Sequence, residues 1–155
     1  MAIKLAIDLN NAATMPISYE AAVPRLHPIK SVIELFPNLV SLEEKTPGRF
    51  YWRLKPIGPS GFEQKVTFAT DITLDLKTGF IQVRPVAGEG NAIINGDWRM
   101  VKQGDKTQVQ MHTWGELNLA LPFFLKTPAK PIVVYEFKNM LDKFIRNLER
   151  EALSA

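Results

Sequence analysis

Histidine and arginine side chains are the residues of this chain best suited to acid–base chemistry, and they are few and scattered. His27 and His112 are the only histidines in the 155 residues. His27 falls at a break between two expected helices and His112 on the polar side of an expected strand, so a two-histidine metal site is not expected. Arg84, Arg99 and His112 are the candidates for an acid, a base or an anion holder, provided that they point into a cavity.

Other catalytic patterns are missing from the sequence. The chain has no cysteine, and therefore neither a thiolate nucleophile nor a cysteine-based metal site. It has no Gly-x-Ser-x-Gly elbow and no phosphate loop, because Gly88-Glu89-Gly90 lacks the following helix that would hold a phosphate. We expect no catalytic residue set, no metal and no cofactor, and the sequence favours binding over catalysis.

Aromatic and methionine side chains give the strongest positive signal, because many of them fall in the inward registers of expected strands and of one helix. Packing in a solid core would explain most of them. The alternative is a cavity, for which methionine is an adaptable lining residue and tryptophan offers one hydrogen-bond donor. Phe144, nearer the far end of the helix, is expected to be core. The residues predicted to line a cavity are Trp52, Phe68, Trp98, Met100, Met111, Phe137, Met140 and Leu141.

The elements that must position these residues follow from hydrophobic periodicity. Alternation predicts a strand over 3–9, and Ser18 is a suitable N-cap for the first of two short helices that are separated near His27. Apolar residues at steps of three and four predict an amphipathic helix over 131–155, which needs a wide curved apolar surface to lie against. The second short helix is expected at 28–35 and the strands at 39–44, 50–55, 62–76, 79–86, 92–102 and 107–121.

The expected turns differ at the two ends of this meander. Asn95-Gly96 is a competing hairpin signal, but a turn there would leave only a very short preceding strand. Three turns are tight and carry lysine, whereas the connections at 57–61, 86–91 and 121–130 are longer and rich in Gly and Pro. Successive hairpin turns alternate between the ends of a sheet, so the longer connections share one end. We predict a ligand entrance there, bordered by Gly88, Gly90, Phe123 and Phe124.

Bulk composition limits the class of protein. The length and the 46% of hydrophobic residues suit one domain spanning 1–155 with a real core. The net charge of +3 comes from 19 basic and 16 acidic residues with no run of five like charges, which argues against a nucleic-acid partner. Residues 1–9 alternate apolar and charged side chains instead of forming a signal-peptide core, and no long apolar run follows. We therefore expect a cytoplasmic protein.

The order of these elements resembles the helix-grip fold of the START-like superfamily, also called SRPBCC. The likeness covers nearly the whole chain and is carried by Phe36-Pro37-Asn38-Leu39, Gly96-Asp97-Trp98 and Leu121-Pro122. The superfamily includes coenzyme Q-binding proteins, polyketide cyclases, lipid-transfer domains and pollen allergens. The resemblance implies an α+β fold in which a curved six-stranded antiparallel meander grips the long helix and encloses a hydrophobic cavity.

Three functions from different classes are consistent with this pattern. The first is binding or transport of a lipid-, quinone- or polyketide-like molecule without chemistry, with Arg84 holding an acidic head group if it faces inward. The second is a polyketide cyclase or dehydratase that uses the same cavity. The third is a protein-interaction module or homodimer built on the outer sheet face around Trp114. Phe123 and Phe124, beside Lys126 and Lys130, also suggest transient contact with a membrane surface.

Overall fold

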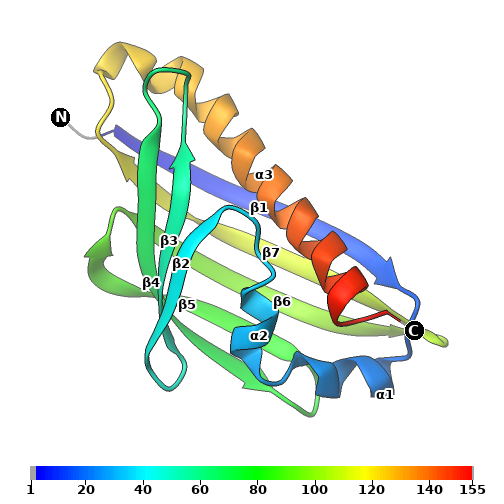
Figure 1. The fold of residues 1–155 in the computed structure, drawn as a ribbon. Helices are drawn as coiled ribbons and strands as arrows, with labels where there is room; N and C mark the ends of the chain where they lie inside the picture. Colours follow the sequence, from blue (N-terminus) through cyan, green and yellow to red (C-terminus); the bar gives the residue numbers. More distant parts are fainter. Residues whose placement is uncertain (1–2, 155) are drawn as a thin grey trace.

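A computed structural model describes residues 3–154 as one antiparallel sheet crossed by a long helix (Figure 1). The strand order is β1-β7-β6-β5-β4-β3-β2, so the first and last strands are neighbours and β2 forms the other edge. The elements are β1 (Ile3–Met15), α1 (Tyr19–Ala22), η1 (Val23–Leu26), α2 (Ile29–Ile33), β2 (Leu39–Thr46), β3 (Arg49–Ile57), β4 (Gln64–Asp75), β5 (Phe80–Gly90), β6 (Ala92–Gln103), β7 (Lys106–Leu119), η2 (Phe123–Leu125) and α3 (Lys126–Glu151).

Strand β1 is longer than predicted and pairs with β7 along its whole length, from Ile3 opposite Leu119 to Met15 opposite Thr107. The prediction stopped at residue 9 because polar residues follow. The inward position among them is Asn11, which is buried and donates from Nδ2 to Asp142 Oδ1 of α3 at 2.5 Å. The partner on α3 satisfies the buried amide nitrogen and so lowers the cost of a polar residue inside the strand, whereas Asn11 Oδ1 has no hydrogen-bond partner among residues 3–154.

The two short helices after β1 are confirmed. Ser18 caps α1, accepting a hydrogen bond from the backbone N–H of Ala21 at 3.3 Å. A single turn of 3₁₀ helix, η1, follows α1, and α2 starts after Pro28 and ends at Ile33, two residues before the predicted end. This shorter helix leaves Phe36 in the connection to β2, where its ring is buried under the long helix.

The meander from β2 to β7 is also confirmed, and Asn95-Gly96 lies inside β6 rather than in a hairpin turn. Strand β4 is shorter than predicted, and its pairing with β5 shifts between Phe68 and Thr70, where residues 86–89 of β5 bulge out. The sheet is strongly twisted, so β3 and β4 run in a different direction from β1 and β7 (Figure 1). This twist makes the curved surface that the long helix needs.

Helix α3 begins at Lys126, five residues before the predicted start at Pro131. Proline favours the first helical turn, which made Pro131 the expected first residue. Pro128 instead occupies the first turn, where no intrahelical donor is required, and Pro131 lies inside the helix. The connection after β7 is consequently short: it covers residues 120–125, of which Phe123–Leu125 form η2. No helix within residues 3–154 is both long and apolar enough to cross a membrane.

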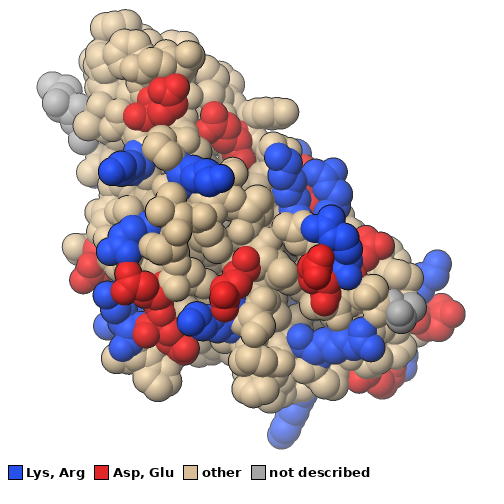
Figure 2. Space-filling model, in the orientation of Figure 1, with Lys and Arg blue, Asp and Glu red and all other residues tan. Residues whose placement is uncertain are grey.

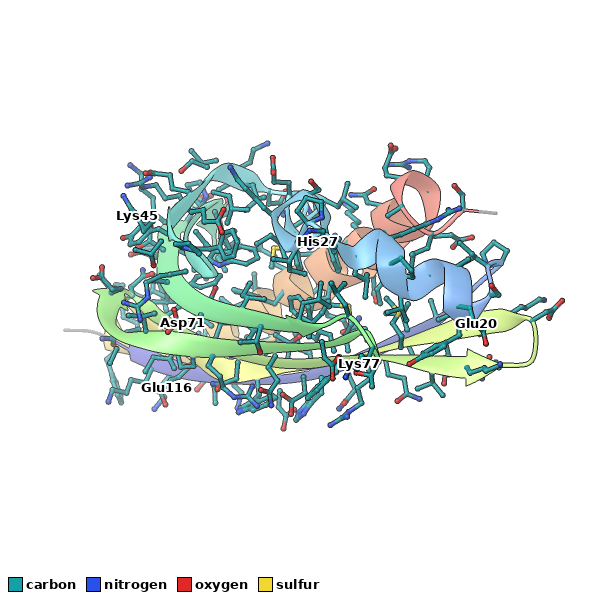
Figure 3. All side chains as sticks on the ribbon, turned by 90° about the horizontal axis from the view of Figure 1, so that it is seen from below. Glu20, His27, Lys45, Asp71, Lys77 and Glu116 are labelled. Carbon is teal, nitrogen blue, oxygen red and sulfur yellow. The ribbon has the colours of Figure 1, made fainter. Side chains whose placement is uncertain are left out.

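The hydrophobic core fills the space between the sheet and the helices. Inward residues of the strands pack against one stripe of α3 that includes Val133, Phe137, Leu141 and Leu148. The opposite sheet face is polar, and Figure 3 shows Glu116 of β7 on that side, away from the helices. These two faces are called the inner and the outer face below.

Candidate functional site

The candidate site is an apolar chamber between the inner face of the sheet and the middle of α3. Six of the predicted cavity residues lie together around it: Trp52, Phe68, Trp98, Phe137, Met140 and Leu141. The sheet provides the first three and α3 the others, because their inward registers face each other across the core. The other lining residues were not predicted from the sequence; they are Phe36, Leu54, Val83, Ile94 and Thr113. Four of these follow the inward alternation of their strands, which was the available signal, and Phe36 lies in the connection before β2.

Aromatic rings nearly fill the chamber. Trp52 stacks on Phe68 with 5.3 Å between ring centroids, and Phe36 stacks on Phe144 at 3.8 Å. Phe36 also meets Trp52 edge to face at 5.5 Å, so one ring from the short-helix segment joins the sheet to α3. The cavity that remains has a volume of about 30 Å³, which leaves room for water but not for an organic ligand. In this state the chamber is closed.

The buried polar atoms around the chamber are already paired. Trp52 Nε1 donates to Thr70 Oγ1 at 2.8 Å, and Trp98 Nε1 donates to Thr113 Oγ1 at 3.0 Å. Gly96 leaves space for the second indole, since a Cβ there would lie 2.7 Å from Trp98 Nε1. In this structure neither indole therefore has a free donor for a ligand. No ionisable side chain of residues 3–154 lines the chamber, so the surface offered to a ligand is almost entirely apolar.

The other two predicted lining residues, Met100 of β6 and Met111 of β7, lie outside the chamber. Met100 and Met111 surround a separate void of about 10 Å³, together with Phe144 and Trp98. This second void is too small for an organic ligand and is typical of a closely packed core. Phe144, expected to be core, is fully buried. Trp98 lines both spaces and divides the interior into two compartments.

A narrow gap beside the chamber reaches toward the surface between α3 and the end of β3. Asn38, Ile57 and Glu136 border it, and it shares Leu54, Phe137 and Met140 with the chamber. Glu136 Oε2 accepts a hydrogen bond from the backbone N–H of Gly58 at 3.2 Å, which ties α3 to the β3–β4 loop. Burial raises the pKa of the Glu136 carboxyl, and the Gly58 hydrogen bond offsets part of this effect.

Arg84, Arg99 and His112 all lie on the outer face, so none can act inside the chamber. Ile81 and Val83 occupy the inner registers of β5, which turns Arg84 outward. Arg84 pairs with Asp97 at 2.8 Å and its guanidinium lies 5.5 Å from the ring centre of Trp114. The proposed roles of Arg84 as a head-group contact and of all three residues as an acid, base or anion holder in the cavity are therefore wrong.

The other two outward residues have partners on the same face. His112 Nε2 is 2.7 Å from Asp8 Oδ1 and its ring stacks on Trp114, whereas Arg99 lies over the ring of Phe80 at 4.3 Å. A polar groove of about 410 Å³ runs along this face between β1, β7 and β6. Because these side chains pack on one another, they stabilise the sheet surface and leave few free groups for a partner. No group of three metal-ligating side chains occurs within residues 3–154.

The glycines and phenylalanines predicted at the entrance do not border the chamber. Gly88 and Gly90 line a shallow groove of about 200 Å³ on the outer face, with Glu116 and Asn118. Gly90 is required for packing, because it has φ +72° and a Cβ there would lie 2.0 Å from Thr67 O. Phe123 and Phe124 form η2 at the start of α3 and are exposed. The entrance itself stays a prediction.

Comparison with known proteins supports the fold independently. No protein-family model and no curated protein matches the sequence. Among solved structures, a START superfamily protein from Mycobacterium smegmatis aligns with a TM-score of 0.64 at 14% identity, covering 94% of this chain and 96% of that one. The Zhui aromatase/cyclase from Streptomyces sp. R1128 aligns with a TM-score of 0.58 at 17% identity, covering 94% of this chain and 95% of that one. A major latex-like protein from Panax ginseng aligns with a TM-score of 0.61 at 16% identity, covering 97% of this chain and 99% of that one.

These alignments span nearly the full length of each chain. The chain therefore has the START-like helix-grip fold, an α+β architecture in which a seven-stranded antiparallel sheet holds a long C-terminal helix. At this level of identity the likeness establishes the fold and leaves the ligand to be inferred from the residues of this chain.

Proposed function

We propose that this protein binds a hydrophobic small molecule, lipid-, quinone- or polyketide-like, in the chamber between the sheet and α3, and does not transform it. The observation that carries the proposal is the chemistry of the lining: aromatic and aliphatic side chains, with both indole donors already paired. Such a surface favours binding of an apolar ligand, and it offers no acid, base or nucleophile to a substrate.

Ligand binding requires the chamber to open, because binding sites for small molecules usually have volumes of about 300–1,000 Å³. The residues best placed to move are Phe36, which lies in a connection, and Met140, which is unbranched and adaptable. The route that we propose is the narrow gap at Asn38, Ile57 and Glu136, because it shares Leu54, Phe137 and Met140 with the chamber. Opening there separates α3 from the β3–β4 loop and breaks the hydrogen bond between Glu136 and Gly58.

Tryptophan fluorescence tests the proposal directly, because two of the three tryptophans line the chamber and the third lies on the outer face. In a Trp114→Phe variant, all tryptophan emission comes from Trp52 and Trp98. We expect a brominated fatty acid, or a short-chain ubiquinone, to quench this emission in a saturable way. A bromine-free fatty acid should compete for the site and restore the emission.

The matched control is a variant that keeps only the outer tryptophan, Trp52→Phe with Trp98→Phe. Its emission should not be quenched at the same probe concentrations, since Trp114 lies across the sheet from the chamber. If the Trp114→Phe variant shows no saturable quenching by any of these probes, the chamber stays closed and the proposed function is wrong. Equal quenching in both variants would indicate contact on the surface instead.

A further inference from the structure

The end of the molecule at which α3 begins carries several large apolar side chains that are exposed to solvent. Phe123 and Phe124 of η2 are 71% and 74% exposed, and Tyr135 of α3 is 68% exposed. Ile132, one turn before Tyr135, and Phe62 of the β3–β4 loop are exposed as well. On the face drawn in Figure 2, the uppermost part of the molecule is tan, and acidic side chains lie directly below it. We call these five residues the aromatic tip.

Two segments far apart in the sequence form the aromatic tip. The β3–β4 loop reaches α3 through the hydrogen bond from the Gly58 N–H to Glu136, and Figure 1 shows both segments at one narrow end of the molecule. The solvent side of α3 changes along its length: Ile132 and Tyr135 are exposed in the first turns, whereas Lys138, Lys143 and Arg146 are exposed later. Exposed apolar residues are thus confined to one end of the helix.

Positive charge accompanies these aromatic residues. Lys126 and Lys130 are exposed in the first turns of α3, and neither forms an ion pair with a residue of the described range 3–154. The first turn of α3 has no acidic residue. The two acidic residues of this end turn toward backbone N–H groups of the β3–β4 loop, Glu63 to Gly61 and Glu136 to Gly58, each at 3.2 Å.

The shape of the aromatic tip fits a membrane better than a protein. A stable protein interface usually buries about 800 Å² on each partner, over a broad face that excludes water. The aromatic tip is five side chains on a narrow end. Aromatic rings with adjacent lysines are the composition that partitions into the interface of a bilayer, where rings sit at the headgroup level and cations meet anionic lipid.

We propose that the aromatic tip docks on a lipid bilayer that carries anionic headgroups. Phe123, Phe124 and Tyr135 enter the boundary between headgroups and acyl chains, while Lys126 and Lys130 contact the anionic headgroups. Docking in this orientation places the gap at Asn38, Ile57 and Glu136 near the bilayer, because Glu136 adjoins Tyr135 in α3. The docking itself does not depend on a ligand in the chamber, so it can be tested with the empty protein.

Sedimentation with vesicles tests this proposal on the full chain. Vesicles of phosphatidylcholine alone are compared with vesicles that also contain phosphatidylglycerol, at low and at moderate salt. We expect the wild type to bind the anionic vesicles at least tenfold more strongly and to lose much of that preference as salt rises. Phe123→Ser with Phe124→Ser should weaken binding to anionic vesicles at least tenfold. Lys126→Gln with Lys130→Gln should abolish the preference for anionic lipid.

The matched control is Val40→Ser with Leu76→Ser, which removes two other exposed apolar residues, one in β2 and one in the β4–β5 turn. This variant should bind vesicles as the wild type does. Thermal unfolding of the double Phe variant should match that of the wild type, because its side chains are already in water. Wild-type protein that stays in the supernatant, or a double Phe variant that binds normally, overturns the proposal. Sedimentation equilibrium adds a further test. If the wild type is a dimer and the double Phe variant is a monomer, the aromatic tip binds a second copy of this chain and the proposal is overturned.

Discussion

Two side-chain hydrogen bonds determine whether the chamber offers polar groups to a ligand. The Nε1–H groups of Trp52 and Trp98 are buried, and each has one hydroxyl partner on the neighbouring strand, Thr70 and Thr113. The arrangement works for Trp98 because Gly96, directly opposite Thr113 in the sheet, leaves room for the indole. Because both N–H groups are already paired, neither is available to hydrogen-bond a ligand in the chamber. Their value to the protein is that no buried N–H is left without an acceptor.

The first prediction at this scale is that Thr113→Val destabilises the protein by about 1–3 kcal/mol, although valine has nearly the same shape. The change removes the hydroxyl that accepts from the Trp98 Nε1–H and leaves that donor buried with no other acceptor among residues 3–154. Urea denaturation measures the loss. Thr113→Ser keeps the hydroxyl and should recover most of it, and Thr73→Val, at an exposed position of the outer face, should change stability by less than about 0.5 kcal/mol.

In the Trp98→Phe background, the effect of Thr113→Val should largely vanish, because phenylalanine has no donor to satisfy. Such a double-mutant cycle isolates the hydrogen bond from the change in packing. Equal destabilisation by Thr113→Val in both backgrounds would assign the cost to packing, and the hydrogen bond would then contribute nothing measurable.

At the scale of elements, alternation and helical spacing were sufficient for most of the fold. The strands of the meander follow a period of two because one face is buried, and this local signal depends on no partner. The end of β1 was missed because Asn11 is an inward polar residue whose partner, Asp142, lies 131 positions away. The start of α3 was missed because Pro131, a good first-turn residue, is tolerated inside the helix. In β5 the sequence allows either the odd or the even positions to face inward. The burial of Val83 in the structure shows that the odd positions do, which places Arg84 on the outer face.

The candidate site was predictable as a set of inward residues, but its volume was not. Register alone identifies the side chains that face the helix, such as Trp52 and Met140. Whether those side chains leave a void depends on how closely their rings pack, for example Phe36 on Phe144 at 3.8 Å. That distance is a property of the whole core and has no signature in the sequence of any one element.

A prediction for α3 follows from the difference between its two compartments. Phe144 is fully buried and stacked on Phe36, so Phe144→Ala should cost about 3–5 kcal/mol, as is usual when a packed aromatic ring is removed. Met140 borders the chamber and the gap that leads to the surface. Met140→Ala should therefore fall at or below the lower end of the usual range of about 2–5 kcal/mol, and it should alter probe binding in the fluorescence assay.

Chemical denaturation of both α3 variants provides the comparison, and Val133→Ala, in the same apolar stripe but outside both compartments, is the reference for ordinary packing. Equal and large losses at Met140 and Phe144, with probe binding unchanged, would mean that the core is solid around both residues. The chamber would then have no function as a binding site.

At the scale of the whole molecule, the free energy of unfolding depends on pH through ionisable groups whose contributions have opposite signs. Hydrogen bonds from Arg53 and Lys45 lower the pKa of Glu43, and a hydrogen bond from Arg49 lowers that of Asp71. These carboxylates stabilise the fold above their unfolded pKa, and that contribution is lost as pH falls. Burial raises the pKa of Glu136, so its contribution has the opposite sign. The native state binds the Glu136 proton more tightly than the unfolded chain does. That contribution is therefore complete at low pH and is lost as pH rises through the folded pKa.

The last prediction concerns Glu136, which links α3 to the β3–β4 loop. It tests whether the negative charge on this half-buried carboxylate destabilises the folded protein. Glu136→Gln keeps an oxygen that can accept from the Gly58 N–H but removes the half-buried charge. We expect the variant to be more stable than the wild type at pH 7, and the difference to shrink toward zero below about pH 4, where carboxyls of the usual Glu range are protonated. Thermal melts across this range measure the difference.

Glu43→Gln is the control with the reverse expectation, because that carboxylate is held by Arg53 and Lys45. It should lower stability at pH 7, modestly since the pair is exposed, and the loss should fade at low pH. If Glu136→Gln instead lowers stability at neutral pH, the charge on Glu136 strengthens its hydrogen bond to Gly58 by more than burial costs. The gap between α3 and the loop would then be held closed by that carboxylate, and a ligand would have to break a favourable contact to pass it.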